Sequence, residues 1–132
     1  MKVTETSLPG VLEIEPNVFA DERGFFLETY RSSRYGDHGM NLQLHQSNHT
    51  RSDRGTLRGL HYQLARPQGK LVFAAHGEIL DVAVDIRRGS STFGQWHAVV
   101  LSDKNNKQLF IPENFAHGFC VLSEIVDLIY LL

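Results

Sequence analysis

The sequence predicts an all-β protein built as a double-sheet jelly roll, and two observations support that prediction. Apolar and polar residues alternate with a period of two over many short stretches of the chain. Clusters of Gly, Pro, Asn and Asp separate these stretches at near-regular intervals, as is typical of strands joined by tight turns. A single stretch, residues 32–35, suggests a turn of helix.

The expected strands follow one another with little room between them. Enrichment in Val, Ile, Phe and Thr agrees with strand structure. There is no internal repeat, low-complexity tract or linker, so we expect residues 1–132 to form one domain. In chain order, the expected strands cover residues 11–15, 41–46, 71–75, 79–85, 96–101, 108–111 and 125–132.

The last expected strand has an unusual setting. Residues 125–132 are mostly apolar, and no turn, cap or polar tail follows them. A strand of this kind leaves backbone groups unpaired and apolar surface exposed, which favours association. We therefore expect either that the natural polypeptide continues or that another subunit covers this strand.

Composition restricts the class of function. The net charge of -2 argues against nucleic acid as the main partner. The N-terminus lacks the apolar core of a signal peptide, and no apolar stretch approaches membrane-spanning length, so we expect a cytoplasmic protein without membrane contact. The single cysteine, Cys120, cannot form an internal disulfide and is expected to be a small buried hydrophobe.

The densest group of polar residues lies at residues 45–49 and 58–63. Alternation places Gln46 and Asn48 on one face of a strand, with Arg58 and His61 on the next strand. Such groups are costly to bury unless something hydrogen-bonds to them. The pattern indicates a site for a ligand rich in hydroxyl and carbonyl groups, and the alternative is a solvated sheet face.

Lys70 and His117 are the remaining candidates. Lys70 opens an apolar strand, where a lysine either extends to water or, if it shares the interior with His61, keeps that imidazole neutral and stabilises an enolate oxygen. Residues 111–119 resemble the second cupin motif, in which the histidine binds a metal. The corresponding first segment, residues 61–63, supplies one histidine and no carboxylate, so we expect no metal.

Together these segments resemble the dTDP-4-dehydrorhamnose 3,5-epimerase family over nearly the whole chain. The most specific segment is Leu57-Arg58-Gly59-Leu60-His61-Tyr62-Gln63. Members of that family continue for several strands beyond the position of Tyr130 and carry there an acid that pairs with the catalytic histidine. The resemblance therefore implies a C-terminal truncation, with Asp85 as a substitute partner for the histidine. It rests on residues 21–26, 46–48, 55–63, 68–72, 77–87, 91–94 and 111–119.

The resemblance implies a cupin-like jelly-roll homodimer that acts on a dTDP-4-keto-6-deoxy sugar without a cofactor. The C4 ketone acidifies the C–H bonds at C3 and C5, so a base near neutrality, such as a histidine, can remove either proton and leave an enolate. By the family's pattern His61 is that base, Lys70 stabilises the enolate, and Tyr130 returns a proton on the opposite face. The implied substrate-binding residues are Arg23, Phe26, Glu28, Gln46, Asn48, Arg58 and His117.

Besides a metal-binding cupin, two other functions stay open at this point. One is a mono-epimerase of the same family that acts at C3 or C5 alone, because the direction of the acid tyrosine decides which carbon is inverted. The other is a sugar-nucleotide-binding module that truncation has made inactive. The implied pathway is deoxysugar supply, such as rhamnose biosynthesis, for surface polysaccharide or for natural-product glycosylation.

Overall fold

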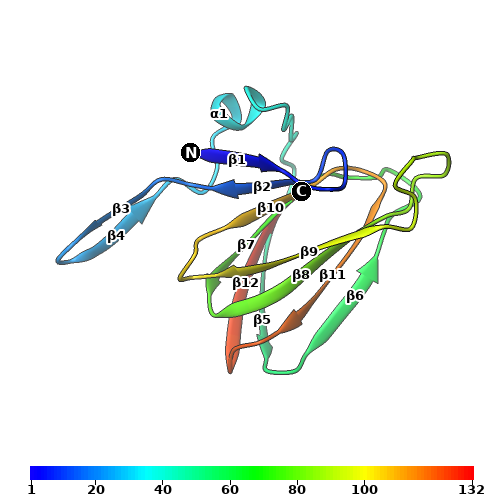
Figure 1. The fold of residues 1–132 in the computed structure, drawn as a ribbon. Helices are drawn as coiled ribbons and strands as arrows, with labels where there is room; N and C mark the ends of the chain where they lie inside the picture. Colours follow the sequence, from blue (N-terminus) through cyan, green and yellow to red (C-terminus); the bar gives the residue numbers. More distant parts are fainter.

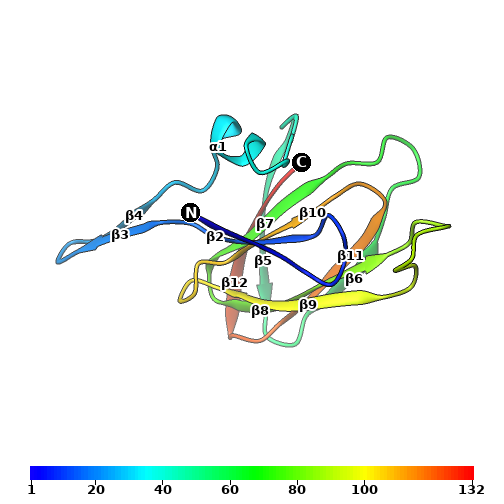
Figure 2. The same cartoon turned by 45° about the horizontal axis from the view of Figure 1, so that its top comes forward.

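The structure, a computed structural model of residues 1–132, consists of twelve strands and one short helix (Figure 1). Six strands form one antiparallel sheet and four form another, and the two sheets face each other around a common core. The remaining two strands form a hairpin that projects from the sandwich (Figure 2). The predicted all-β, double-sheet jelly roll is confirmed.

The larger sheet has the strand order β1-β2-β10-β7-β12-β5. The last strand of the chain, β12, pairs with β5 on one side and with β7 on the other. The expectation that this strand leaves its backbone unpaired is therefore wrong. An apolar strand that is paired on both sides in the middle of a sheet has the same sequence pattern as an apolar strand without neighbours. The strands are β1 (Lys2–Glu5), β2 (Leu12–Glu15), β5 (Ser47–Asp53), β7 (Lys70–His76), β10 (Gln108–Ile111) and β12 (Ile125–Leu131).

The smaller sheet has the order β6-β11-β8-β9. Its strands are β6 (Leu57–His61), β8 (Glu78–Asp85), β9 (Trp96–Ser102) and β11 (Phe115–Val121). Along β8 every second residue is buried, which turns Ile79, Asp81, Ala83 and Asp85 toward the larger sheet. This strand therefore brings two carboxylates into the interior.

Apolar side chains from both sheets fill the space between them. Fifteen buried residues form the main core, among them Val72, Leu101 and Leu128. The short helix α1 (Ser32–Gly36), which agrees with the predicted helical turn, buries Tyr35 in a second cluster. No helix has the length and apolar character needed to span a membrane.

Two segments differ from the sequence prediction. Residues 41–46 alternate like a strand but form none; instead His45 and Leu132 are joined by a backbone hydrogen bond, and pairing with β12 begins at Ser47. The hairpin of β3 (Val18–Asp21) and β4 (Gly24–Leu27) was not predicted at all. Every residue of β3 is exposed, so this hairpin lacks the half-buried alternation that marks a sheet strand.

Candidate active site

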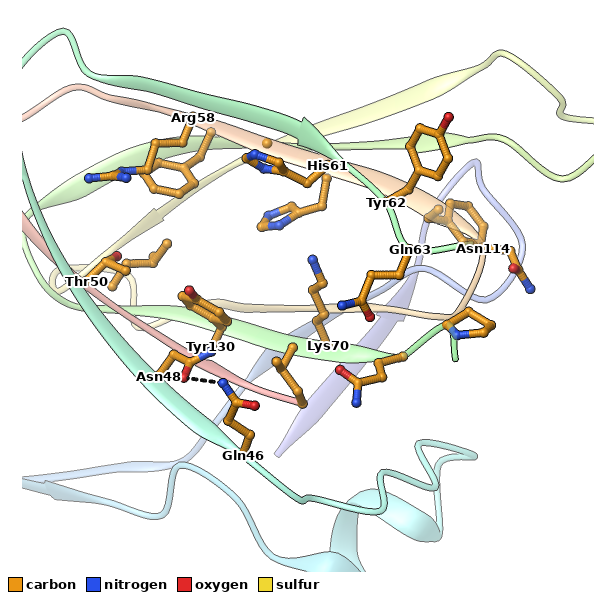
Figure 3. A pocket seen from close by; sticks show the side chains of 18 residues that line it. Gln46, Asn48, Thr50, Arg58, His61, Tyr62, Gln63, Lys70, Asn114 and Tyr130 are labelled. Atoms are coloured by element: carbon orange, nitrogen blue, oxygen red, sulfur yellow. Dashed lines mark hydrogen bonds between the residues drawn. The ribbon is translucent and has the colours of Figure 1, made fainter. Parts of the chain in front are cut away.

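A cavity of about 630 Å³ opens between the two sheets (Figure 3). No Asp or Glu side chain lines it, whereas Arg58 and Lys70 do, so its charge suits an anionic ligand. Seven of the ten predicted site residues lie on its walls. The lining residues are Gln46, Asn48, Thr50, Arg58, His61, Tyr62, Gln63, Pro67, Gln68, Lys70, Asn114, Phe115, His117, Gly118, Phe119, Leu128, Tyr130 and Leu132.

An extra residue in β6 puts Arg58 and His61 on the same wall. His61 lies opposite His117 on β11, and Arg58 lies opposite Phe119, so three steps along β6 match two steps along β11. In a regular strand, side chains three positions apart point to opposite faces. This β-bulge turns both side chains into the cavity.

Two glycines make the bulge possible. Gly59 has φ +104°, a conformation that L side chains rarely adopt, and a Cβ there would lie 2.6 Å from the Cα of Gly118. A Cβ on Gly118 would in turn lie 2.7 Å from the carbonyl oxygen of Arg58. The two backbones therefore approach more closely at this point than any residue with a side chain permits.

Lys70 and Tyr130 come from the larger sheet and face His61 across the cavity. Lys70 begins β7, and Tyr130 lies between Val72 of β7 and Asn48 of β5 in the β12 register. Figure 3 shows the Lys70 amine pointing toward His61, with Tyr130 beside Asn48 on the same wall as Lys70. The pKa of Lys70 is lowered by burial, and the charge of Asp81 partly opposes that effect.

The polar walls hold groups free to bind a ligand. The Nε of Arg58 donates to Ser52 Oγ at 3.1 Å, and its terminal nitrogens make no hydrogen bond to the protein. Gln46 donates through Nε2 to the Oδ1 of Asn48 at 2.8 Å. An anchored guanidinium whose terminal nitrogens are free suits a phosphate group.

His117 is held by a carboxylate that the sequence analysis missed. Its Nε2 lies 2.6 Å from Oδ1 of Asp81, which has no exposed surface. The other oxygen of Asp81, Oδ2, is buried and has no hydrogen-bond partner. Asp81 could have been found from the sequence, because it is a charged residue in phase with the inward-facing Ile79 and Ala83.

The two cavity histidines, His61 and His117, are Cα partners on neighbouring strands. The side chain of His61 makes no hydrogen bond within the chain, so both of its ring nitrogens are available to a ligand. No group of three or more His, Cys, Asp or Glu side chains is arranged to hold a metal ion.

Asp85 does not orient His61, so that prediction is wrong. Its carboxylate accepts hydrogen bonds from Arg87, Ser90 and Thr92. These bonds, with Arg87 the largest influence, hold the pKa of Asp85 well below its ordinary range. The Arg87 guanidinium in turn lies over the ring of Phe115, 4.6 Å from its centre, and so supports a wall of the cavity.

The relationship to known proteins follows from sequence and structure together. A family model described as dTDP-4-dehydrorhamnose 3,5-epimerase matches residues 5–132. This chain belongs to the dTDP-4-dehydrorhamnose 3,5-epimerase family. It is 53% identical to the dTDP-4-dehydrorhamnose 3,5-epimerase of Pseudomonas aeruginosa strain PAO1 over 131 residues, which are 98% of this chain and 72% of that protein. Members of this family are isomerases.

Solved structures of epimerases share the fold. A dTDP-6-deoxy-D-glucose-3,5-epimerase from Legionella pneumophila, in complex with dTDP-4-keto-L-rhamnose, superposes with a TM-score of 0.96 at 49% identity, covering 98% of this chain and 70% of that one. A 3'-monoepimerase from Streptomyces bikiniensis, with a histidine and a tyrosine replaced and dTDP bound, has a TM-score of 0.89 at 31% identity, covering 96% of this chain and 65% of that one.

Three residues predicted from the epimerase family lie outside the cavity. Arg23 and Phe26 are on the projecting β3–β4 hairpin, and Glu28 follows it. Arg23 pairs with Asp21 at the hairpin turn, while Glu28 accepts hydrogen bonds from two nearby arginines. Phe26 is 68% exposed. Within one copy of the chain, these side chains do not join the other seven.

Proposed function

We propose that this chain epimerises a dTDP-4-keto-6-deoxy sugar at C3 and C5 without a cofactor. In this proposal His61 is the base, Lys70 stabilises the enolate and Tyr130 is the acid. One arrangement supports it: a histidine on one sheet faces a tyrosine and a lysine on the other, across a cavity that no Asp or Glu side chain lines.

The chemistry follows from that separation. His61 takes the proton from the carbon next to the C4 ketone, the electron pair moves to the ketone oxygen, and Lys70 stabilises the enolate. When the enolate collapses, Tyr130 delivers a proton to the opposite face of the carbon, which inverts it. Proton exchange with water then restores the histidine and the tyrosine. Repeating these proton transfers at the second carbon requires that the sugar present both C–H bonds to His61 in turn.

The remaining residues of the cavity bind the substrate in this proposal. The free terminal nitrogens of Arg58 are suited to the diphosphate. Gln46, Asn48 and His117 present polar groups that suit sugar hydroxyls. Arg58 therefore provides charge-assisted binding, and the amides determine how the sugar is oriented.

We also propose a homodimer in which the hairpin of one copy reaches the cavity of the other. Phe19, Phe25 and Phe26 on this hairpin are 63%, 64% and 68% exposed, and contiguous exposed aromatic side chains are typical of interaction surfaces. An exchanged hairpin would bring Arg23, Phe26 and Glu28 to the substrate. It would also account for their position outside the cavity of their own chain.

The setting of the reaction is part of the proposal. We propose that residues 1–132 act as one domain. A sugar nucleotide carries a charged diphosphate and does not cross a membrane unaided, so we also propose that the reaction takes place in the cytoplasm. The product would supply deoxysugar, in rhamnose biosynthesis, for polysaccharide or for natural-product glycosylation.

Solvent deuterium tests the reaction directly. The chain is incubated with dTDP-4-keto-6-deoxyglucose in heavy water, and the sugar is analysed by mass spectrometry and NMR. We expect deuterium at both C3 and C5, and none with His61→Ala. A protein that binds dTDP but incorporates no deuterium would be a binding module, and the proposal would fail.

The same experiment examines a second candidate, a mono-epimerase. The similarity to a 3'-monoepimerase at 31% identity shows that this fold is shared with enzymes named for one carbon. Deuterium at a single carbon, with inversion at that carbon alone, would favour this candidate over the 3,5-epimerase.

A further inference from the structure

Asp81 puts a carboxylate inside the sandwich, directly behind the cavity. It lies on the inward face of β8, has no exposed surface, and is the Cα partner of Phe119 on β11 and of Val99 on β9. A carboxylate in such surroundings is costly unless hydrogen bonds and opposite charge compensate it. The hydrogen bond between His117 and Asp81 provides part of this compensation.

One oxygen of Asp81 fixes the ring of His117. Because an ionised carboxylate only accepts hydrogen bonds, Nε2 of His117 is the donor to Asp81 in the 2.6 Å contact. The other ring nitrogen of His117 is Nδ1. It has no partner in the chain and is not among the buried unpaired atoms, so it is open to the cavity that His117 lines. Carboxylates commonly fix histidine rings in this way.

The other oxygen of Asp81 is buried and has no hydrogen-bond partner. Asp81 is the carboxylate whose charge raises the pKa of Lys70 against the effect of burial. The charged and titratable side chains that share the cavity with Lys70 are Arg58, His61, Tyr62, His117 and Tyr130, and none of them carries a carboxylate. The negative charge that acts on this lysine therefore comes from behind the wall.

We propose that Asp81 is a positioning residue for the epimerase site: it orients His117 through one oxygen and keeps Lys70 a cation through the charge of its carboxylate. It does not touch the substrate. A neutral amine at position 70 would stabilise an enolate oxygen far less than an ammonium does. This role deepens the proposed function and rests on it.

The first test does not depend on activity. Lys70 is one of four lysines, so its titration can be followed by NMR of 13Cε-labelled lysine and assigned with Lys70→Gln. We expect Asp81→Asn, which keeps the shape and removes the charge, to lower the midpoint of Lys70 by about one pH unit. The exposed Asp53→Asn is the matched control and should leave it unchanged. An unchanged midpoint in Asp81→Asn would overturn the proposal.

A second measurement uses the unaltered protein and so stands even if Asp81→Asn does not fold. 15N NMR distinguishes the two neutral tautomers of a histidine. We expect Nε2 of His117 to carry a proton, and an Nε2 without a proton would contradict the proposal.

Kinetics then connects Asp81 to the reaction. We expect Asp81→Asn to lower kcat for deuterium exchange about 10- to 100-fold at neutral pH. The alkaline limb of the pH profile of kcat should move to lower pH by the same amount as the titration midpoint of Lys70 measured by NMR. A purely structural role of Asp81 would not cause this shift. An alkaline limb that stays at the same pH in Asp81→Asn would overturn the role of Asp81. Absence of exchange in the unaltered chain would instead overturn the proposed function, while both NMR results would still report on Asp81.

Discussion

In the proposed reaction His61 and Tyr130 divide the two proton transfers, and they can do so because they belong to different sheets. The separation between the sheets therefore sets the distance across which the sugar must fit. Lys70 lies on the same wall as Tyr130, so in the proposed reaction the enolate oxygen is stabilised from the side that later returns the proton. Each of these three residues has a role that can be removed without removing the other two.

Tyr130→Phe should separate exchange from inversion. The phenyl ring that packs against the core remains, and only the acid hydroxyl is lost. We expect inversion to fall by about 10²-fold or more, while exchange with retention continues because His61 still removes the proton. NMR of the product in heavy water measures both rates at once. Equal loss of exchange and inversion would show that the tyrosine also takes part in proton removal.

Lys70→Met should make the protein more stable and less active. Because burial lowers the pKa of Lys70, the folded state disfavours its charged form at pH 7. We expect an apolar side chain of similar length to raise the free energy of unfolding by about 0.5–1 kcal/mol. The gain should shrink as the pH rises through the pKa of Lys70, and kcat should fall about 10²- to 10³-fold. Urea unfolding and exchange kinetics check the two effects, and a destabilised variant would contradict the first.

At the scale of elements, the site depends on a break in the regular pattern of β6. Strict alternation would send Arg58 and His61 to opposite faces, so periodicity alone could not have put both in one cavity. Family resemblance identified both residues, and the bulge explains how they meet. Periodicity could not predict that Lys70 and Tyr130 lie close together either. Their proximity depends on the pairing of β7 with β12, which are far apart in the chain.

Gly118→Ala should damage the site through the bulge. The added methyl group would meet the backbone of Arg58 and Gly59 at 2.7 and 3.3 Å, so β6 must move away from β11. We expect a loss of about 1–3 kcal/mol in unfolding free energy, with dTDP affinity and exchange both reduced. Gly36→Ala, which has an ordinary φ and no close neighbour below 3.4 Å, is the control. Calorimetric titration with dTDP would contradict the expectation if Gly118→Ala bound normally.

Asp85 should control stability at acid pH. Its pKa is lowered in the folded state, so the unfolded chain binds the extra proton and stability falls as the pH drops below about 4. We expect Asp85→Asn to lower the free energy of unfolding by about 3 kcal/mol at pH 7, because Arg87 then lacks its partner. The difference in unfolding free energy between this variant and the unaltered protein should shrink toward pH 3. Asp127→Asn should cost less, since its partners Arg51 and His49 are exposed. Thermal unfolding between pH 3 and 7 measures both, and a constant difference for Asp85→Asn would contradict the assignment.

At the scale of the whole molecule, alternation predicted that there would be two sheets but not how their strands pair. The central place of β12 and the exposure of the β3–β4 hairpin are properties of long-range contacts, which short-range periodicity does not contain. The same applies to Arg23 and Phe26: their sequence motif was recognised, yet the structure puts them outside the cavity of their own chain. A site completed by a second copy reconciles these observations.

Mixing two inactive variants tests that assembly. Arg23→Ala removes a hairpin residue, and His61→Ala removes the base, so each variant alone should form sites that all carry one defect. If hairpins are exchanged, a mixed dimer contains one site with the intact His61 of one copy and the intact Arg23 of the other. We therefore expect mixing, after dissociation and reassociation, to restore up to about one quarter of normal exchange activity, since random pairing makes about half the dimers mixed with one good site in each. If Arg23 acted in the cavity of its own chain, every site would keep a defect, and the mixture would show only the mean of the two variants' residual activities.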